Sequence, residues 1–591
     1  YKLQLFDKRK LKKVNGIWDI KSCTGNKFIK EIDPTNFKHL DETKIIKQIE
    51  KIINQSYEFM GYTGFANKID KLIKKSVGTT SDRNKQLKRK RYIIKKEFSD
   101  RMLVIDEVHN VRSKSTKIKR TTQNMLDLVT HAENMKLMLL TATPMFNDYK
   151  EIIWLINLLN LNDKRYTIKE SEIFDKNGNF LQDERGIEIG KELFIQKVTG
   201  YISYVRGNNP FTFPYSIYPN DAKNEQSLIN ITDKGWQYPR VQLNGAEIVA
   251  PIESLDLTMI NIGEYQYKGY QYILNSIKQK YTVLNDGNKG VPYTALDAPR
   301  QALNIVYPHK DLETSNELGL YNYIYGSKGL SRVMLYDERT TSNFKYKDNI
   351  LQDFGKIFSF ENIGKYSSKI EYVCKSIMES KGIIFVYSEY IYGGAVPMAL
   401  ALEELGFTRY GKNKSLFETP PTEPIDSTTM RPKRGAEKIK QASYIMITGD
   451  KNLSPDIKKD IKAVTGSDNI NGEKVKVIIV SRAGSEGLDF KNIREMHILD
   501  PWYNLNRQEQ IIGRAVRNLS HCALPFEDRN VSIFLYGTVL PDETEAADLF
   551  IYRLAEEKAR KMATVSRVLK ENAIDCLLNK SNQTFTVENI D

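Results

Sequence analysis

Short apolar runs separated by polar stretches recur along the chain and predict the strands of a parallel sheet. The run VKVIIV at 475–480 is rich in Val and Ile and is too short for a buried helix. Comparable runs precede Asp106 and Thr141 and occupy 383–388 and 444–448. Uninterrupted apolar runs are typical of parallel strands that are buried on both faces. The pattern predicts an α/β fold in which function lies in the loops at the carboxyl ends of these strands.

Apolar residues at helical spacing fill the intervals between the runs. They recur every three or four residues in 41–54, 265–279, 365–382 and 546–569. A repeated order of strand and helix is the expected order of a parallel α/β fold.

Two acidic residues, Asp106 and Glu107, follow directly after the run that ends at Ile105. Magnesium is a hard ion that prefers carboxylates and phosphates, and a second carboxylate can orient and deprotonate an attacking water. Adjacent acidic residues after a strand also occur as a helix N-cap, so the pair alone leaves both interpretations open.

An arginine pair lies near the carboxyl-terminal end of the chain. Gln510, Gly513, Arg514 and Arg517 form the pattern Q-x-x-G-R-x-x-R. On a continuous helix the two arginines would share one face, and a pair of guanidinium groups suits a phosphate. Without further context, the same spacing is typical of an ordinary solvated helix face.

Four segments give these residues a context. DEVH at 106–109, TATP at 141–144, SRAGSEGLDF at 481–490 and QIIGRAVR at 510–517 follow one another in this order. The set resembles motifs II, III, V and VI of superfamily 2 helicases and nucleic-acid translocases. The phrases SYVRGNNPFTFP, GIIFVYSEYIYGG, DPWYN and SHCALP further resemble the helicase-like ATPases of large nucleocytoplasmic DNA viruses, a group that includes poxvirus nucleoside triphosphatase I and the small subunit of the viral early transcription factor.

The resemblance implies two RecA-like parallel-sheet lobes, with an inserted domain between them and a C-terminal helical extension. The expected segments are a first RecA-like lobe at 1–162, an extension of it at 163–221, an inserted domain of unknown role at 222–350, a second RecA-like lobe at 351–545 and the helical extension at 546–591.

The resemblance also implies roles for the residues around motifs II and III. Asp106 would hold Mg²⁺ through water, and Glu107 would activate the water that attacks ATP. His109 would link the nucleotide site to the TATP segment, although a histidine of this kind can also be a satisfied core residue. The coupling residues of that segment are Thr141, Ala142 and Thr143.

In motifs V and VI, the resemblance implies that Gly487 approaches the nucleotide or nucleic acid through its backbone and that Asp489 accepts a ribose hydroxyl. Gln510, Arg514 and Arg517 would reach the nucleotide from the second lobe, with Arg517 as the arginine finger.

Three further residues are candidates for nucleic-acid contacts. They are Arg206, Ser388 and Thr448. A run of basic residues at 68–96 could meet a phosphate backbone through salt-sensitive contacts, and the alternative is an exposed linker helix.

A superfamily 2 ATPase should carry G-x-x-x-x-G-K-[ST] ahead of its DEVH segment, and none precedes Asp106. The G-x-x-x-x-G-K pattern from Gly406 to Lys412 continues with Asn413 and follows a helix-like stretch, so Gly406 is better explained as a helix C-cap. We therefore expect the natural chain to carry an amino-terminal P-loop segment outside this sequence, with a degenerate ATPase as the alternative.

The composition limits the kinds of partner that we expect the protein to bind. The 591 residues carry a formal net charge of +14, which favours a polyanionic partner such as nucleic acid. The four cysteines are scattered without metal-ligand spacing, no run reaches the roughly 18 apolar residues of a membrane span, and no signal peptide opens the chain. The sequence predicts a protein that is not secreted and has no membrane partner.

The expected function is a DNA-dependent ATPase that moves along duplex DNA, with ATP and Mg²⁺ as cofactors. The resemblance implies a role in viral early transcription, a viral RNA polymerase or another transcription-factor subunit as partner, and a location in the virion and the host cytoplasm. The alternative is a subunit that keeps the RecA frame without hydrolysis and recruits polymerase or binds promoter DNA.

Overall fold

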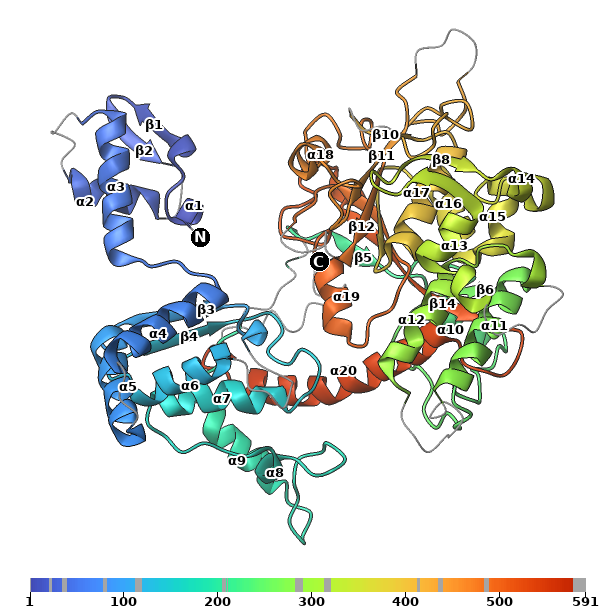
Figure 1. The fold of residues 1–591 in the computed structure, drawn as a ribbon. Coiled ribbons are helices and arrows are strands. Elements are labelled where there is room, and N and C mark those ends of the chain that lie inside the picture. The colour runs from blue at the N-terminus through green and yellow to red at the C-terminus, as the bar shows by residue number, and fades with distance from the viewer. Residues whose placement is uncertain are drawn as a thin grey trace. The chain divides into compact units, whose positions relative to one another are not determined.

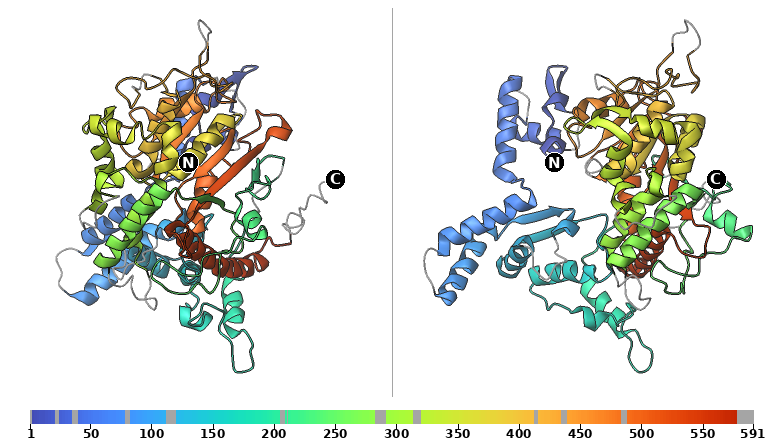
Figure 2. Two further views of the ribbon diagram at one scale, coloured as in Figure 1. Left: turned by 90° about the vertical axis from the view of Figure 1, so that its right-hand side faces the viewer. Right: turned by 45° about the vertical axis from the view of Figure 1, so that its right-hand side comes forward.

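The structure, a computed structural model, forms two compact units (Figures 1 and 2). Unit 1 comprises Tyr1–Ala142 and Asn157–Thr167, and unit 2 comprises Thr143–Ile156 and Ile168–Asp591. The residues that the structure describes are 2–20, 24–34, 40–77, 82–111, 120–204, 209, 211–281, 291–312, 320–411, 415–433, 439–482 and 488–577.

Unit 1 begins with a small α+β subdomain. Strands β1 (Leu11–Val14) and β2 (Ile17–Ile20) form an antiparallel hairpin that packs with α2 (Gly25–Ile32) and α3 (Glu42–Ser56). Helix α3 has its buried residues at four-residue spacing, which gives it one apolar face, and the Asp41 carboxylate caps its first turn.

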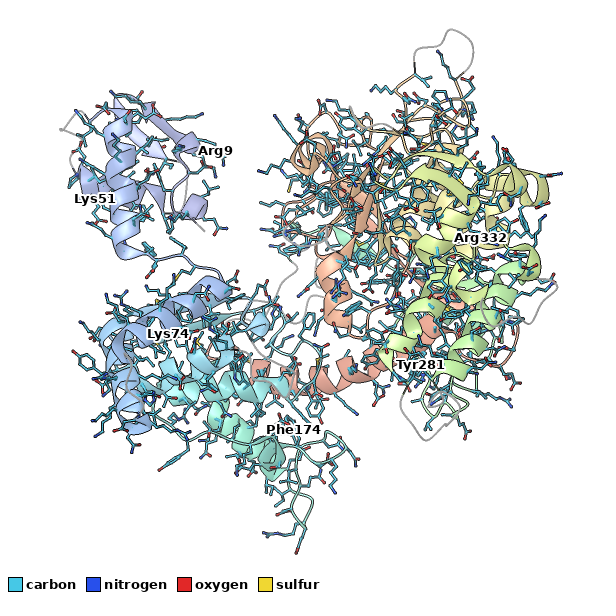
Figure 3. The ribbon with its side chains drawn as sticks, viewed as in Figure 1. Arg9, Lys51, Lys74, Phe174, Tyr281 and Arg332 are labelled. Atoms are coloured by element: carbon cyan, nitrogen blue, oxygen red, sulfur yellow. The ribbon has the colours of Figure 1, made fainter. Side chains whose placement is uncertain are left out.

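The rest of unit 1 carries the predicted motif II strand. The elements are α4 (Tyr62–Val77), α5 (Arg83–Phe98), β3 (Met102–Asp106), α6 (Arg120–His131), β4 (Lys136–Leu140) and part of α7 (Glu151–Asn162). Strands β3 and β4 pair in parallel with Asp106 opposite Leu140. The side chains of Lys51 on α3 and Lys74 on α4 are labelled in Figure 3.

The prediction that the β3 and β4 runs are buried on both faces is wrong. Met102, Val104, Met138 and Leu140 are all exposed, whereas Ile105 is buried. Exposure alternates along each strand because, within the described residues, only one face of this two-stranded sheet is covered.

Unit 2 is built on a parallel sheet, which confirms the α/β class. Among the described residues eight strands take part, in the order β10-β11-β12-β9-β13-β14-β5, with β6 also pairing β14. The strands are β5 (Tyr215–Ile217), β6 (Thr258–Asn261), β9 (Ile383–Ser388), β10 (Thr408–Arg409), β11 (Ser443–Ile447), β12 (Val477–Ser481), β13 (Ile493–Ile498) and β14 (Asn530–Val539). Strands β9, β11 and β12 are buried along their whole length, as their uninterrupted apolar runs predict.

Unit 2 also contains α-helices and one π-helical turn. They are α8 (Glu170–Ile173), α9 (Ile189–Val198), α10 (Leu228–Asp233), α11 (Glu264–Lys280), α12 (Asp297–Asn304), α13 (Gly326–Val333), α14 (Asp348–Phe354), α15 (Phe360–Tyr366), α16 (Ser368–Glu379), the π-helical turn η7 (Ile391–Ala395), α17 (Val396–Glu404), α18 (Ile457–Val464), α19 (Leu505–Ile512) and α20 (Ala547–Glu571). A small hairpin of β7 (Met334–Asp337) and β8 (Ser342–Tyr346) adds to them. No helix among the described residues is long and apolar enough to cross a membrane.

The segment 222–350, expected to be an inserted domain, shares its core with the rest of unit 2. Tyr270, Val306 and Leu330 belong to the same buried cluster as Val386 and Tyr536 of the central strands. Strand β6 of this segment also extends the sheet through β14. The amphipathic spacing seen in the sequence is the same whether a helix covers its own core or a neighbouring sheet, so the sequence pattern could not distinguish the two.

A buried ion pair fixes α16 and α20 to the sheet. Lys369 Nζ lies 2.7 Å from Asp548 Oδ2, and the two side chains are 2% and 1% exposed. Thr538 of β14 donates its hydroxyl to the same carboxylate at 2.6 Å, and Lys369 also donates to the carbonyl oxygen of Leu499 at 3.2 Å. Both charges are therefore matched inside the core, where an unmatched charge would be strongly destabilising.

We predict that Lys369→Met or Asp548→Leu alone lowers the free energy of unfolding by about 3–5 kcal/mol, because each leaves one buried charge without its partner. The double variant should be close to the parent protein in stability. Urea unfolding followed by circular dichroism measures this. Lys375→Met, which breaks the exposed Lys375–Glu371 pair, is the control and should cost less than about 1 kcal/mol. A double variant that is as unstable as the two single losses added together would contradict the prediction.

Candidate nucleotide and nucleic-acid sites

The motif II carboxylates lie where the parallel pairing of β3 and β4 puts them. Because Asp106 is the partner of Leu140, Asp106 and Thr141 stand at the same carboxyl edge of the strand pair. His109, in the short 3₁₀ turn Val108–Asn110, has its Nδ1 3.0 Å from Thr141 Oγ1. The structure thus joins motifs II and III by a hydrogen bond, between two residues that were predicted from the sequence to be linked.

Glu107 differs from its neighbours in its exposure and in its backbone conformation. Its carboxylate is half exposed and lies 3.4 Å from His109 Nδ1, whereas the imidazole is almost fully buried. The backbone of Glu107 is left-handed, with φ 50° and ψ 47°. This conformation is uncommon for a residue other than glycine, and residues strained in this way cluster at functional sites.

Tyr62 supports this turn from outside the motif. Its hydroxyl donates to the carbonyl oxygen of Glu107 at 3.0 Å and also to that of Asp106. Burial raises the pKa of Tyr62, and the carboxylates of Asp106 and Glu107 raise it further, so the hydroxyl stays a hydrogen-bond donor. Nothing in the sequence indicated this role for Tyr62, because a tyrosine gives no sign of which backbone it will contact.

Asp106 is the residue that fits Mg²⁺ best in unit 1. Its side chain is exposed at a strand end, and its backbone is held by β3 and Tyr62. Among the described residues no group of three or more His, Cys, Asp and Glu side chains could hold a metal. One carboxylate is nevertheless enough for Mg²⁺, which keeps most of its waters and binds substrate phosphates.

The TATP segment divides between the two units: Thr141 and Ala142 belong to unit 1, and Thr143 belongs to unit 2, where it is buried. The loop that follows it is bound to the start of α19. Asn506 donates to the carbonyl oxygens of Met145 at 2.6 Å and Phe146 at 3.0 Å.

Asn504 extends this link. It caps α19 by accepting from the Arg507 N–H at 3.2 Å, and its side-chain amide donates to Asn147 Oδ1 at 2.8 Å. Within unit 2, the loop after motif III therefore contacts the helix that carries Gln510.

The arginines of motif VI do not lie on a helix, and the prediction of a shared helix face is wrong. Helix α19 ends at Ile512 with Gly513 as its C-cap, so Arg514 and Arg517 lie in the turns that follow. The turns still bring the two side chains together. Arg517 forms an ion pair with Asp489, and Arg514 Nη1 lies 4.0 Å from the same carboxylate oxygen and donates to the Leu488 carbonyl oxygen at 3.3 Å.

Two of the residues predicted to contact nucleic acid are buried and form hydrogen bonds within unit 2. Ser388 is buried and donates its hydroxyl to Asp500 at 2.7 Å. Thr448 is buried as well, and its backbone N–H donates to Ser454 Oγ at 2.8 Å. Arg206 and Gly487 lie outside the described residues.

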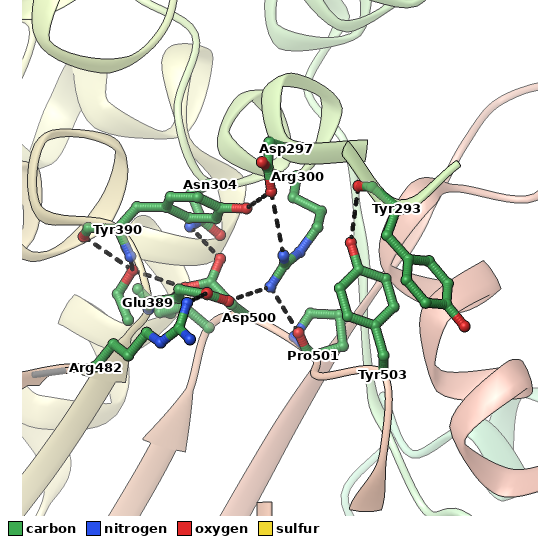
Figure 4. A network of polar contacts seen from close by, with 12 residues as sticks. Tyr293, Asp297, Arg300, Asn304, Glu389, Tyr390, Arg482, Asp500, Pro501 and Tyr503 are labelled. Atoms are coloured by element: carbon green, nitrogen blue, oxygen red, sulfur yellow. Dashed lines mark hydrogen bonds and ion pairs between the residues drawn. The ribbon is translucent and has the colours of Figure 1, made fainter. Parts of the chain in front are cut away.

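A network around Arg300 was missed by sequence reasoning (Figure 4). The guanidinium is 2% exposed and donates to Glu389 Oε2 at 2.8 Å and to the Pro501 carbonyl oxygen at 2.7 Å. The rings of Tyr390 and Tyr503 lie within 5.5 Å of it. Burial raises the pKa of Glu389, and Arg300 opposes that rise. Arg300 therefore joins α12 to the ends of β9 and β13.

Asp500 completes this network. It accepts from Asn304 Nδ2 at 2.6 Å, from Ser388 Oγ at 2.7 Å and from the Glu389 backbone N–H at 2.8 Å. A Cβ at Gly394 would collide with the Ser388 hydroxyl, so the glycine of this π-helical turn is required for the close approach. The sequence signals for the network were the segments GIIFVYSEYIYGG, which contains Ser388 and Glu389, and DPWYN, which begins at Asp500, but neither indicated Arg300.

The ring of Trp502 lies beside this network and is partly buried. The guanidinium of Arg507 lies 4.3 Å from the centre of the Trp502 ring, and that of Arg482 lies 5.0 Å from it. Arg482, which is half exposed, also bonds Glu389 Oε1 at 3.3 Å. Trp502, Arg482 and Arg507 therefore form a partly exposed cluster of one aromatic ring and two cations. Arg482 directly follows β12 and belongs to the motif V segment.

Comparison with known proteins places the motifs in two families. Residues 33–191 match the SNF2-related domain, and residues 433–518 match the helicase conserved C-terminal domain. The first match contains Asp106 and Glu107, and the second contains Gln510, Arg514 and Arg517.

Relatives occur in several large DNA viruses. A protein of Acanthamoeba polyphaga mimivirus, named as an ATP-dependent RNA helicase, is 26% identical over 620 residues, which cover 98% of this chain and 51% of that protein. A protein of Invertebrate iridescent virus 3, named as a helicase, is 25% identical and the match covers 92% of this chain and 44% of that protein. The termination factor NPH-I homolog of African swine fever virus is 24% identical, with coverages of 81% and 63%. The chain spans about half the length of the first two relatives.

Solved structures overlap only loosely. The Pyrococcus furiosus Hef helicase domain is 12% identical at a TM-score of 0.31, covering 84% of this chain and 90% of that one. The Sulfolobus solfataricus SWI2/SNF2 ATPase core domain is 13% identical at 0.24, with coverages of 76% and 65%. The assignment therefore rests on the sequence matches. By these matches the chain carries an SNF2-related domain and a helicase conserved C-terminal domain, and it is similar to helicase-like proteins of large DNA viruses.

Proposed function

We propose that this protein hydrolyses ATP and couples hydrolysis to movement along duplex DNA. The observation that carries the proposal is the strand-end arrangement of unit 1, in which His109 bonds Thr141 beside the half-exposed carboxylate of Glu107. A group placed in this way can take a proton from water, and the histidine can pass a change at the nucleotide to the motif III segment.

In this proposal Asp106 holds Mg²⁺ through water, and the ion neutralises charge on the phosphates of ATP. Glu107 orients the attacking water and accepts its proton. Its backbone is left-handed, Tyr62 donates to its carbonyl oxygen, and its carboxylate lies beside His109. Arg514 and Arg517 supply positive charge for the phosphoryl group as it is transferred.

Asp489 has a second role in the proposal. In the structure its carboxylate pairs with Arg517, which is 43% exposed and can exchange partners. The phosphates of ATP carry more negative charge than one carboxylate, so they compete for the guanidinium. Asp489 then becomes available for a ribose hydroxyl, which is the role that the family resemblance implies.

The proposed cellular role is in viral early transcription, as an initiation or termination factor. The African swine fever virus relative, named as a termination factor, supports this role. A viral RNA polymerase or a second transcription-factor subunit is the partner expected for it, and the virion and the host cytoplasm are the places where that machinery works. A net charge of +14 supports a nucleic-acid substrate.

RNA is the second candidate substrate, because the mimivirus relative is named as an RNA helicase. Motor motifs that track a backbone look alike for the two nucleic acids. Assays with duplex DNA, single-stranded DNA and RNA in parallel distinguish the candidates: stimulation of ATP hydrolysis by RNA alone would contradict the DNA proposal.

We predict that Glu107→Gln lowers DNA-stimulated ATP hydrolysis at least about 100-fold, because the amide cannot accept the proton of the attacking water. The measurement is phosphate release with and without duplex DNA. Glu58→Gln is a matched control in the same unit, since its carboxylate is 51% exposed, and it should hydrolyse ATP at the parental rate. Absence of turnover in the parent under every condition would favour a non-hydrolysing subunit that recruits polymerase.

We predict that Arg517→Ala lowers kcat about 10³-fold with little change in ATP binding, because an arginine finger acts on charge that develops in the transition state. Arg517→Lys should stay impaired, since an ammonium group lacks the planar fork of a guanidinium. Arg567→Ala, at an exposed position of α20, is the control. A loss of ATP binding equal to the loss of rate would show that Arg517 serves binding rather than catalysis.

A further inference from the structure

Helices α4 and α5 pack against each other and against α6 (Figure 1), and apart from Tyr62 at the start of α4 they have no role in the motif II site described above. We call this pair, residues 62–77 and 83–98, the basic hairpin. It lies wholly within unit 1 and precedes the motif II strand β3 in the chain.

Helix α5 is unusual for a surface helix. Eight of its sixteen residues are Lys or Arg, and one is acidic. Of these sixteen residues, all of which the structure describes, only Ile94 is buried. A surface helix is normally fixed by an apolar stripe, and like charges three or four positions apart destabilise it. The composition of α5 is therefore costly unless the charges serve a purpose.

The cations of α5 fall into two sets. On the side toward α6, Lys90 pairs with Asp127 and Lys95 pairs with Glu133. These pairs neutralise the charges that help to hold the helix in place. On the opposite side from Ile94 stand other cations, which the fold leaves exposed.

This second set forms a line along the helix. Lys85, Lys88, Tyr92 and Lys96 follow one another at three- or four-residue spacing on the side away from Ile94, and all four are exposed, Tyr92 by 65%. From Lys85 to Lys96 the line is about 16 Å long, at about 1.5 Å of rise per residue. That length matches about five phosphate steps of one strand, measured along a DNA duplex. We call these four residues the lysine stripe.

We propose that the lysine stripe binds the phosphodiester backbone of duplex DNA and holds unit 1 on its track. The proposal rests on the DNA-translocase function proposed above. Exposed Lys71, Lys74 and Lys75 on α4 extend the positive charge of the hairpin, and Figure 3 labels Lys74 on this helix. Lysine ammonium groups contact phosphates as point charges, so the contact is independent of base sequence.

The stripe fits a duplex better than a single strand. Proteins that bind single strands stack successive bases on several aromatic side chains, whereas the stripe offers one, Tyr92. A straight line of charges on a rigid helix instead suits the regular backbone of a duplex. Since no residue of the stripe belongs to the nucleotide-binding motifs, its DNA contact persists in every nucleotide state.

The test removes the charges of the stripe in the full-length protein. The triple variant Lys85→Gln, Lys88→Gln and Lys96→Gln keeps helix propensity, because Gln and Lys are similar helix formers. Affinity for a fluorescent DNA duplex is measured by anisotropy between about 50 and 200 mM salt. We expect the triple variant to bind the duplex at least about 10-fold more weakly than the parent near 100 mM salt. In a plot of log affinity against log salt concentration, the magnitude of its slope should be smaller than that of the parent by about 2–3.

A second triple variant is the matched control. Lys44→Gln, Lys47→Gln and Lys51→Gln remove the same charge from exposed positions along one helix, α3, in the same unit. Its salt slope should equal that of the parent. Thermal unfolding of both variants checks that the helices remain folded, and ATP hydrolysis without DNA should be unchanged in both.

The possible results distinguish a failure of the lysine-stripe proposal from a failure of the motor proposal. If the parent shows DNA-stimulated hydrolysis and the two triple variants have the same salt slope, the stripe proposal is overturned and the motor proposal stands. If the parent binds no duplex DNA at all, both proposals fall. Tighter binding of the parent to a single strand or to an RNA duplex than to duplex DNA would also overturn the stripe as a duplex-DNA contact.

Discussion

A charge inside a protein must be matched by an opposite charge, and the core of unit 2 depends on this constraint. Arg300 is matched by Glu389, and Lys369 is matched by Asp548. The partners come from segments far apart in the chain, so each pair joins two of them. Together the pairs tie α12, α16 and α20 to the parallel sheet, beside the buried cluster that described residues of 222–350 share with the central strands. Breaking the match would therefore loosen several elements at once.

Hydrogen bonds to a buried carboxylate organise the carboxyl ends of the strands. Asp500 follows β13 and accepts hydrogen bonds from Asn304, Ser388 and the backbone of Glu389. These bonds leave little freedom to the loops after β9 and β13, and they place Trp502 between two arginines. A rigid frame of this kind is consistent with the proposed function, since packed side chains and rigid elements can carry coupling between distant sites.

The sequence was informative where the signal is local. Uninterrupted apolar runs identified β9, β11 and β12, and the order of the motifs predicted the link between His109 and the TATP segment that the hydrogen bond to Thr141 makes. The sequence was uninformative where the partner of a side chain lies far away along the chain. Nothing near Arg300 indicates a carboxylate 89 residues later in the chain. Gly513 was a local sign that α19 ends there, but the spacing of the motif suggested a longer helix. The exposed face of β3 and β4 could not be predicted, because an apolar run has the same sequence pattern whether or not another element covers it.

Strand β14 has a consequence for how the protein is made. It pairs with β5, which lies about 300 residues earlier, and with β6, which is only slightly closer in the chain. Pairing over such distances is slow, because a long loop must close before any contact forms. During synthesis, β5, β6 and the helices between them leave the ribosome long before their partner exists. Their apolar surfaces must wait unpaired in the meantime, so this chain is a natural client for chaperones that hold such surfaces apart.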